Sequence, residues 1–220
     1  LVLLERPASL NGLSFREKRV EALKAVTVPT VGTIRERTLR ARYTAGTIGS
    51  RTVPAYVDEP GVDPARNTET YAAVDLEMRS PRWAGTRFTL RHGKALARDT
   101  AEVAIHFRQA HDYFGDPRAG MLRNVLRIGL MEPYVCLETV LNGPESIPVS
   151  RTLGMLSAQP RRTAYANLVA EMLSGRPAVF IGGGEAEELW RIFDPIVKSW
   201  ANDDVPLRTY PAGGEPPGAS

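Results

Sequence analysis

Hydrophobic and polar residues alternate with a period of two in several stretches of the chain. The cleanest stretch is 72–79, where every second position is apolar, and the pattern recurs over 87–91 and 101–108 on either side of a turn. Because successive side chains of a strand point to opposite faces of a sheet, each stretch predicts a half-buried strand. Residues 125–131 and 134–141 are two more strand candidates. Successive strands without helices between them favour an antiparallel sheet.

Helical spacing appears on both sides of this strand-rich region. Ser14 and Glu17 have the spacing of a capping box, which predicts a helix that starts at Ser14 and ends by Pro29. Residues 165–173 carry an i, i+3, i+4, i+7, i+8 apolar stripe that stops at Gly175, and residues 189–200 carry a second stripe. Strands followed by helices predict the α+β fold class.

Two segments lack periodicity. Residues 42–66 are rich in Gly, Pro, Thr and Asp and predict a long irregular connection, while residues 206–220 predict an exposed tail. We therefore expect one domain over residues 1–205, followed by that tail. The chain opens on the apolar run 1–4, which resembles the last turn of a helix begun earlier, so we expect it to be cut from a longer polypeptide.

Composition and charge limit the kinds of partner and compartment that we expect, but they do not indicate a function. The chain has 28 Lys and Arg against 25 Asp and Glu, and the small excess is scattered, so we expect no nucleic-acid partner. No stretch reaches the roughly 18 apolar residues of a membrane span, and no secretory signal is apparent, which predicts a cytoplasmic protein without a membrane partner. Cys136 lies in an apolar run and is expected to be a buried, inert thiol.

Three motifs follow one another in the middle of the chain: TETYAA at 68–73, RWAG at 82–85 and LRHGKAL at 90–96. Their order and spacing resemble the TETYAA, RWAG and LRTGKRL succession of glucose-6-phosphate dehydrogenases, and the chain is identified as a member of that family through its C-terminal domain. Further segments extend the resemblance over nearly the whole chain: 7–9, 16–20, 164–168, 188–192, 194–196 and 210–213.

The resemblance implies a fold and an activity. The fold is a large, mostly antiparallel sheet backed by helices, which contributes to the sugar-phosphate pocket and to a homodimer or homotetramer interface. The activity is oxidation of glucose 6-phosphate to 6-phosphogluconolactone with NADP, in the pentose phosphate pathway. The family's catalytic His, its G-x-x-G nucleotide loop and its Rossmann domain belong to a portion upstream of Leu1, so this chain alone is expected to be inactive and to hold NADP mainly through that portion.

Lys94 is the candidate substrate-binding residue. In the family, the lysine of the G-K-x-L turn contacts the substrate, and Lys94 is the matching residue. An ammonium group on a tight turn at a strand end can meet a phosphate or a sugar oxygen as a point charge. The alternative is an ordinary solvated turn lysine.

Several positions depart from the family pattern. Five residues after the lysine the family places a second basic residue, where this chain has Asp99, and a carboxylate repels a phosphate dianion. The adjacent Arg98 points to the other face if the segment is a strand. The family's Q-P-D-E-G strand end reads Met131, Glu132, Pro133, and its F-x-R-x-D-E segment reads 180–185, FIGGGE.

The remaining candidates are weaker. Residues 182–184, three glycines before a helix, resemble a phosphate-cradling loop, but no repeated strand-helix unit surrounds them, so a flexible loop is the preferred interpretation. The histidines His92, His106 and His111 have no metal-ligand spacing, and we expect no metal. His92 is expected to be a turn residue near the pocket.

Two functions stay open at this stage. The first is the C-terminal portion of an NADP-dependent glucose-6-phosphate dehydrogenase. The second is a stand-alone, non-catalytic paralogue that acts as a dimerisation or regulatory module, which the departures at Asp99, Met131 and the glycine run favour.

Overall fold

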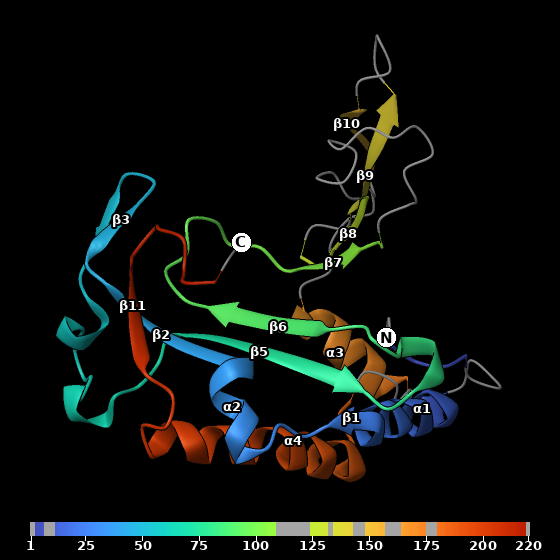
Figure 1. Ribbon diagram of the computed structural model, residues 1–220, viewed down its shortest axis with the longest axis horizontal. Coiled ribbons are helices and arrows are strands. Elements are labelled where there is room, and N and C mark those ends of the chain that lie inside the picture. Colours follow the sequence, from blue (N-terminus) through green and yellow to red (C-terminus); the bar gives the residue numbers. More distant parts are fainter. Residues whose placement is uncertain are drawn as a thin grey trace. The chain divides into compact units, whose positions relative to one another are not determined.

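The protein is described by a computed structural model that covers residues 3–6, 12–108, 124–131, 134–142, 148–156, 164–174 and 180–218. The chain divides into two compact units (Figure 1). Unit 1 comprises residues 1–97 and 162–220, and unit 2 comprises residues 98–161. The α+β class is confirmed, with the strands distributed over a five-stranded sheet, a four-stranded sheet and a two-stranded hairpin.

The sheet of unit 1 has the strand order β1-β5-β2-β11, and β6 pairs with β5. All its pairs are antiparallel except β2 with β11, which are parallel (Figure 1). The predicted strands at 72–79 and 87–91 are confirmed. The strands are β1 (Val26–Thr27), β2 (Thr38–Thr44), β5 (Tyr71–Met78), β6 (Phe88–Gly93) and β11 (Leu207–Pro211).

Three helices cover one face of this sheet (Figure 1): α1 (Gly12–Ala25), α2 (Val31–Arg37) and α4 (Gly183–Ala201). Their apolar side chains meet Val74, Leu76 and Met78 of β5, which are all buried. The predicted alternation in this strand therefore marks the main core of the unit. Its other buried members are Val26, Ile34, Ile192, Ile196, Trp200 and Val205.

The opposite face of the same sheet carries a second core at one end. It is built from Tyr43, Tyr71 and Tyr210 with small and aliphatic residues around them. The expected irregular connection at 42–66 is only partly irregular, because it contains the hairpin of β3 (Gly46–Ile48) and β4 (Arg51–Val53), which packs into this core. The single-turn helices η1 (Tyr56–Asp58) and η2 (Pro64–Arg66) follow, and η3 (Pro81–Trp83) lies between β5 and β6.

Unit 2 is an antiparallel sheet in the order β10-β9-β8-β7. The strands predicted at 101–108, 125–131 and 134–141 are confirmed. The bounds are β7 (Glu102–His106), β8 (Val125–Gly129), β9 (Tyr134–Asn142) and β10 (Pro148–Leu156). On one face Arg127 bonds Glu102 and Glu138, both at 2.6 Å. The Tyr134 hydroxyl, together with Arg127, holds the pKa of Glu102 below its usual range.

Helix α3 (Ala164–Leu173) confirms the helix predicted at 165–173, and its expected stop at Gly175 lies outside the described residues. Two expectations are wrong in detail. Helix α1 begins at Gly12 rather than at Ser14, so the Ser14–Glu17 pair lies inside the helix. Residues 207–213 are not an exposed tail, because β11 pairs with β2 and buries Tyr210 and Ala212.

Candidate functional site

The turn after β6 presents Lys94 with an exposed side chain at the edge of the five-stranded sheet. Its backbone is held from both sides. The Lys94 amide donates to the Thr70 carbonyl at 2.9 Å, and the Lys94 carbonyl accepts from the Tyr210 hydroxyl at 2.7 Å. The fixed backbone and free ammonium suit a point-charge contact with an anionic ligand.

The C-terminal segment supports this turn at a second point. The Gly213 amide donates to the Ala95 carbonyl at 2.8 Å, and Ala95 adopts a left-handed backbone with φ of 50°. A non-glycine residue in that region costs roughly 1–2 kcal/mol, so external bonds are needed to hold it there. Residues 210–213 therefore hold the carbonyls of two successive residues of the turn.

Thr70 closes the hydrogen-bond arrangement around Lys94. Its hydroxyl accepts from the Tyr43 amide at 3.0 Å and lies 3.2 Å from the Tyr210 hydroxyl. Since the Tyr210 proton goes to the Lys94 carbonyl, the Thr70 hydroxyl is the donor in its contact with Tyr210. The Tyr43 amide, the Thr70 hydroxyl and the Tyr210 hydroxyl then each have an acceptor for their proton.

Three buried aromatic rings pack together behind the Lys94 turn. Tyr210 packs edge-on against Tyr71 at 6.0 Å and against Tyr43 at 6.4 Å between ring centroids. Burial raises the pKa of Tyr210 and of Tyr71. Burial also raises the pKa of Tyr43, which donates to Glu59 at 2.5 Å. All three hydroxyls therefore stay protonated well above neutral pH, and those of Tyr43 and Tyr210 remain hydrogen-bond donors.

The other predicted residues have different surroundings. His92 was expected to be a turn residue, but it lies within strand β6, paired with Ala72, and its side chain is exposed. Arg98 and Asp99 are exposed and belong to unit 2, as does Met131, whose side chain is 42% exposed. Glu132, Pro133 and His111 lie outside the described residues, and His106 is exposed on β7. Cys136 was expected to be buried, but on β9 it is only half-buried.

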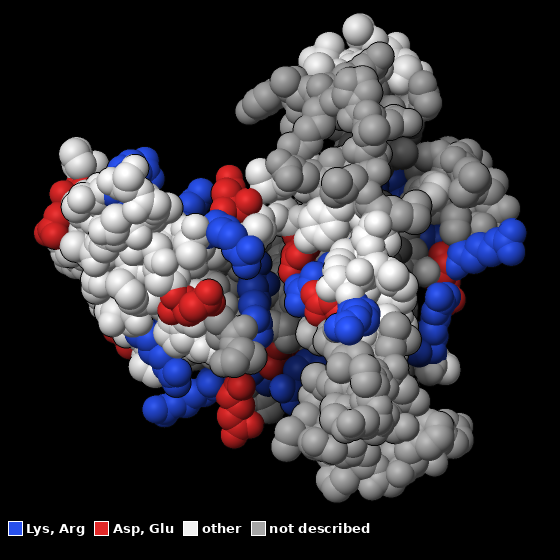
Figure 2. All heavy atoms as spheres, turned by 90° about the horizontal axis from the view of Figure 1, so that it is seen from above, with Lys and Arg blue, Asp and Glu red and all other residues white. Residues whose placement is uncertain are grey.

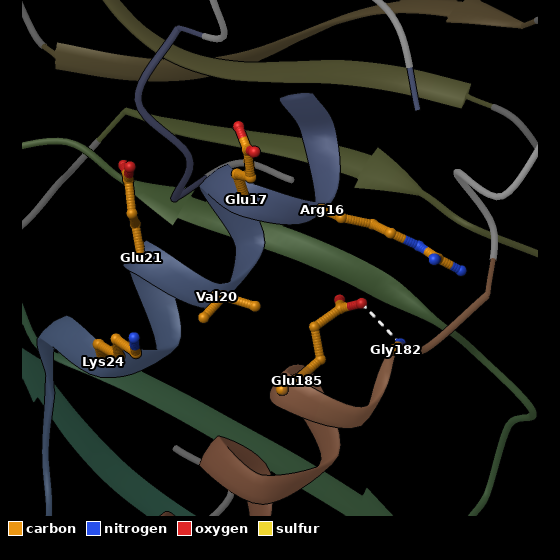
Figure 3. A pocket seen from close by; sticks show the side chains of 8 residues that line it. Arg16, Glu17, Val20, Glu21, Lys24, Gly182 and Glu185 are labelled. Atoms are coloured by element: carbon orange, nitrogen blue, oxygen red, sulfur yellow. Dashed lines mark hydrogen bonds between the residues drawn. The ribbon is translucent and has the colours of Figure 1, made fainter. Parts of the chain in front are cut away.

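The glycine run lies beside a groove of about 430 Å³ between α1 and α4 (Figure 3). The expectation of a flexible loop is wrong for its last two residues, because Gly183 and Gly184 form the first turn of α4. Glu185 bends back so that its carboxylate accepts from the Gly182 amide at 2.9 Å (Figure 3). Arg19 pairs with the same carboxylate at 2.7 Å.

This arrangement does not fit a dinucleotide. Glu185 is buried, and its carboxylate takes the place near the helix N-terminus where a phosphate binds in nucleotide-binding proteins. Glu17 and Glu21 add two more carboxylates to the lining of the groove, and Arg16 and Lys24 add two cations, so its charge is mixed. Because the Gly182 amide already donates to Glu185, the position where a phosphate would bind at this helix N-terminus is taken by the chain's own carboxylate.

Acidic and basic side chains are interleaved on the face of the molecule shown in Figure 2. This agrees with the scattered charge of the sequence. Among the described residues, no three His, Cys, Asp or Glu side chains gather closely enough to hold a metal ion. Within the same residues, every helix is too short or too polar to cross a bilayer.

Sequence reasoning singled out Lys94 but missed Thr70, Tyr210 and Gly213 as its supports. The signal was present, because Thr70 belongs to the TETYAA motif and residues 210–213 belong to the YPAG segment. Motifs so far apart along the chain meet only through the parallel pairing of β11 with β2.

A family model described as "Glucose-6-phosphate dehydrogenase, C-terminal domain" matches residues 1–220. The chain is 32% identical over 223 residues to the glucose-6-phosphate 1-dehydrogenase of Gluconobacter oxydans, covering 99% of this chain and 45% of that protein. It is also 32% identical over 225 residues to the enzyme of the same name from Mycolicibacterium smegmatis, with coverage of 99% and 45%. The chain thus spans less than half the length of these curated relatives.

Solved structures agree. A glucose-6-phosphate dehydrogenase in complex with its substrate glucose 6-phosphate superposes with a TM-score of 0.80 at 25% identity, covering 98% of this chain and 45% of that one. A glucose-6-phosphate 1-dehydrogenase from Mycobacterium avium superposes with a TM-score of 0.79 at 23% identity, with coverage of 96% and 42%. Because the second structure is only 23% identical in sequence, it supports the fold and not the function.

Proposed function

The chain belongs to the glucose-6-phosphate dehydrogenase family through its C-terminal domain, and from this premise we propose that it supplies the substrate side of an enzyme that oxidises glucose 6-phosphate to 6-phosphogluconolactone in the cytoplasm. The observation that carries the proposal is Lys94, an exposed ammonium group on a turn whose backbone is fixed at both its amide and its carbonyl. In this role Lys94 binds and orients the sugar phosphate.

The chemistry of the reaction is divided between this chain and the rest of the enzyme. Hydride transfer needs a nucleotide cofactor and a base for the sugar hydroxyl. We assign NADP and the base to the other half of the protein, because the helix N-terminus of the glycine run is filled by Glu185. The part of this chain is then to hold the anionic end of the substrate.

Lys94→Ala tests the substrate contact. Charge-assisted hydrogen bonds contribute about 1.5–3 kcal/mol, so the change is expected to weaken glucose 6-phosphate binding by about 10- to 100-fold. The measurement is the rise in melting temperature of this chain with added glucose 6-phosphate, and the dissociation constant from calorimetry. The control is Lys198→Ala, which removes an exposed lysine paired with Asp194 on α4. Equal affinities for wild type and Lys94→Ala would remove Lys94 from the site.

We also propose that the enzyme is a homodimer or homotetramer assembled through the sheet of unit 2. Most residues on one face of this sheet are apolar, and two of its large apolar side chains are exposed, Val135 at 45% and Leu153 at 60%. Strand pairing places Leu153 opposite Leu137, so both lie on that face. Exposed apolar surface of this kind is typical of an interaction site.

Leu153→Lys is expected to convert the oligomer to monomer, because a buried unpaired ammonium at an interface is strongly unfavourable. The measurement is molar mass by light scattering after size-exclusion chromatography. The neighbouring Thr152→Lys adds the same charge to the opposite face, beside Glu138, and should leave the oligomer intact. A monomeric wild-type chain, or an oligomer that survives Leu153→Lys, would contradict assembly through this face.

A second function is favoured by one observation, the carboxylate of Asp99 where the family places a basic residue. In that case the chain is a binding or assembly module without catalysis. The two functions separate by the intact mass of the protein from its own source and by the thermal shift above. A mass well above 24.1 kDa together with a Lys94-dependent thermal shift supports the dehydrogenase.

A further inference from the structure

The C-terminal strand supports the substrate lysine from behind. Tyr210 on β11 is 2% exposed, and its hydroxyl donates to the Lys94 carbonyl at 2.7 Å. The contact joins residues 116 positions apart in the sequence. Because the bond is made to the backbone, it leaves the Lys94 ammonium free.

We propose that Tyr210 is a positioning residue for substrate binding, which acts through the Lys94 backbone and never touches the substrate. The inference rests on the proposed role of Lys94. It requires that the turn would otherwise sample other conformations, and the left-handed Ala95 immediately after Lys94 meets that requirement. A lysine side chain has four rotatable bonds, so a fixed backbone is the main control over where its charge lies.

The geometry singles out the hydroxyl rather than the ring. Tyr210 and Tyr71 are neighbouring buried rings of the same core, in edge-on contact at 6.0 Å. The Tyr71 hydroxyl is buried and has no hydrogen-bond partner among the described residues, whereas the Tyr210 hydroxyl joins Lys94 and Thr70. Removing each hydroxyl therefore gives a matched pair: Tyr210→Phe breaks the support, and Tyr71→Phe breaks nothing.

The first measurement is independent of any ligand. Hydrogen exchange of the Lys94 amide, which donates to Thr70, reports local opening of the turn. Tyr210→Phe removes the hydroxyl's contacts with the Lys94 carbonyl and the Thr70 hydroxyl, so it is expected to speed this exchange by at least the three- to tenfold, about one neutral hydrogen bond, that the Lys94 contact contributes. Tyr71→Phe is expected to leave the exchange unchanged. Equal exchange in Tyr210→Phe and wild type would overturn the proposal.

The second measurement joins the turn to the ligand. Tyr210→Phe is expected to weaken glucose 6-phosphate binding by about three- to tenfold, and in the enzyme that contains this chain to raise KM with kcat unchanged. The loss should vanish in a Lys94→Ala background, since Tyr210 acts only through Lys94. A loss that persists there would show a merely structural effect and overturn positioning.

The outcomes separate the two proposals. The proposed function is contradicted if glucose 6-phosphate does not bind, or if Lys94→Ala binds it as tightly as wild type. In either case the exchange experiment still reports whether Tyr210 holds the turn. Binding that depends on Lys94 but is the same in Tyr210→Phe and Tyr71→Phe retains the proposed function and overturns the positioning role.

Discussion

Gly213→Ala is expected to lower the free energy of unfolding by more than about 4 kcal/mol, the range of exceptional point mutations. Gly213 adopts φ of 79°, and an added Cβ would lie 1.9 Å from the Thr47 carbonyl oxygen of the β3–β4 hairpin. The colliding atom belongs to the backbone, so no side-chain rotation relieves the clash. The segment must move away from the hairpin, which also breaks the Gly213 bond to Ala95.

Gly49→Ala is a control that has the unfavourable backbone conformation but not the steric clash. Gly49 has φ of 59°, but nothing lies within 4 Å of its added Cβ, so only the left-handed strain of about 1–2 kcal/mol is expected. Urea unfolding followed by far-ultraviolet circular dichroism measures both variants. If Gly213→Ala lowers the free energy of unfolding by no more than Gly49→Ala does, residue 213 does not approach the hairpin as closely as the structure shows.

Trp200→Ala is expected to lower the free energy of unfolding by about 3–5 kcal/mol. The Trp200 side chain is 6% exposed and packs in the main core between α4 and the sheet. Its ring nitrogen also donates to the Thr38 hydroxyl at 3.0 Å, which ties the end of α4 to the start of β2. Truncation removes a large buried area and leaves a cavity at this junction.

The same substitution elsewhere on α4 provides the control. Trp190 is 63% exposed, so Trp190→Ala should change the free energy of unfolding by no more than about 0.5 kcal/mol. Both variants lose one tryptophan from the same helix, which matches them for composition and helix propensity. Similar losses of unfolding free energy in the two variants would contradict a packing of α4 in which the Trp200 side chain faces the core.

The two strands at the centre of unit 1 differ in how well sequence reasoning found them. β5 was predicted because its apolar residues alternate against solvated ones. β2 was missed because it breaks that pattern: Arg40 is 3% exposed inside the core. Its guanidinium bonds the Val205 carbonyl at 2.8 Å and Asp203 at 2.6 Å. Those partners lie over 160 residues away, so no local pattern reveals that an arginine is buried there.

Tertiary contacts also explain the errors at the two glycine-rich segments. Residues 207–213 have the composition of a tail, yet the free edge of β2 accepts them as a parallel strand. The run at 182–184 has the composition of a loop, yet Glu185 bonds back to Gly182 while Arg19 of α1 neutralises the carboxylate. In both cases a residue or strand distant in sequence stabilises a regular element, β11 or the first turn of α4, that the local composition disfavours.

The sequence by itself determined the α+β class, the one-sided strands, the later helices and the family, and it marked Lys94 as the residue to test. These are local signals, because the period of apolar residues and the order of motifs can be recognised without knowledge of the tertiary contacts. Only the tertiary structure decided that Tyr210 and Gly213 hold the Lys94 turn. That contact depends on a parallel pairing between strands at opposite ends of the chain, and hydrogen bonds to backbone carbonyls leave no mark on the sequence of the residue that accepts them.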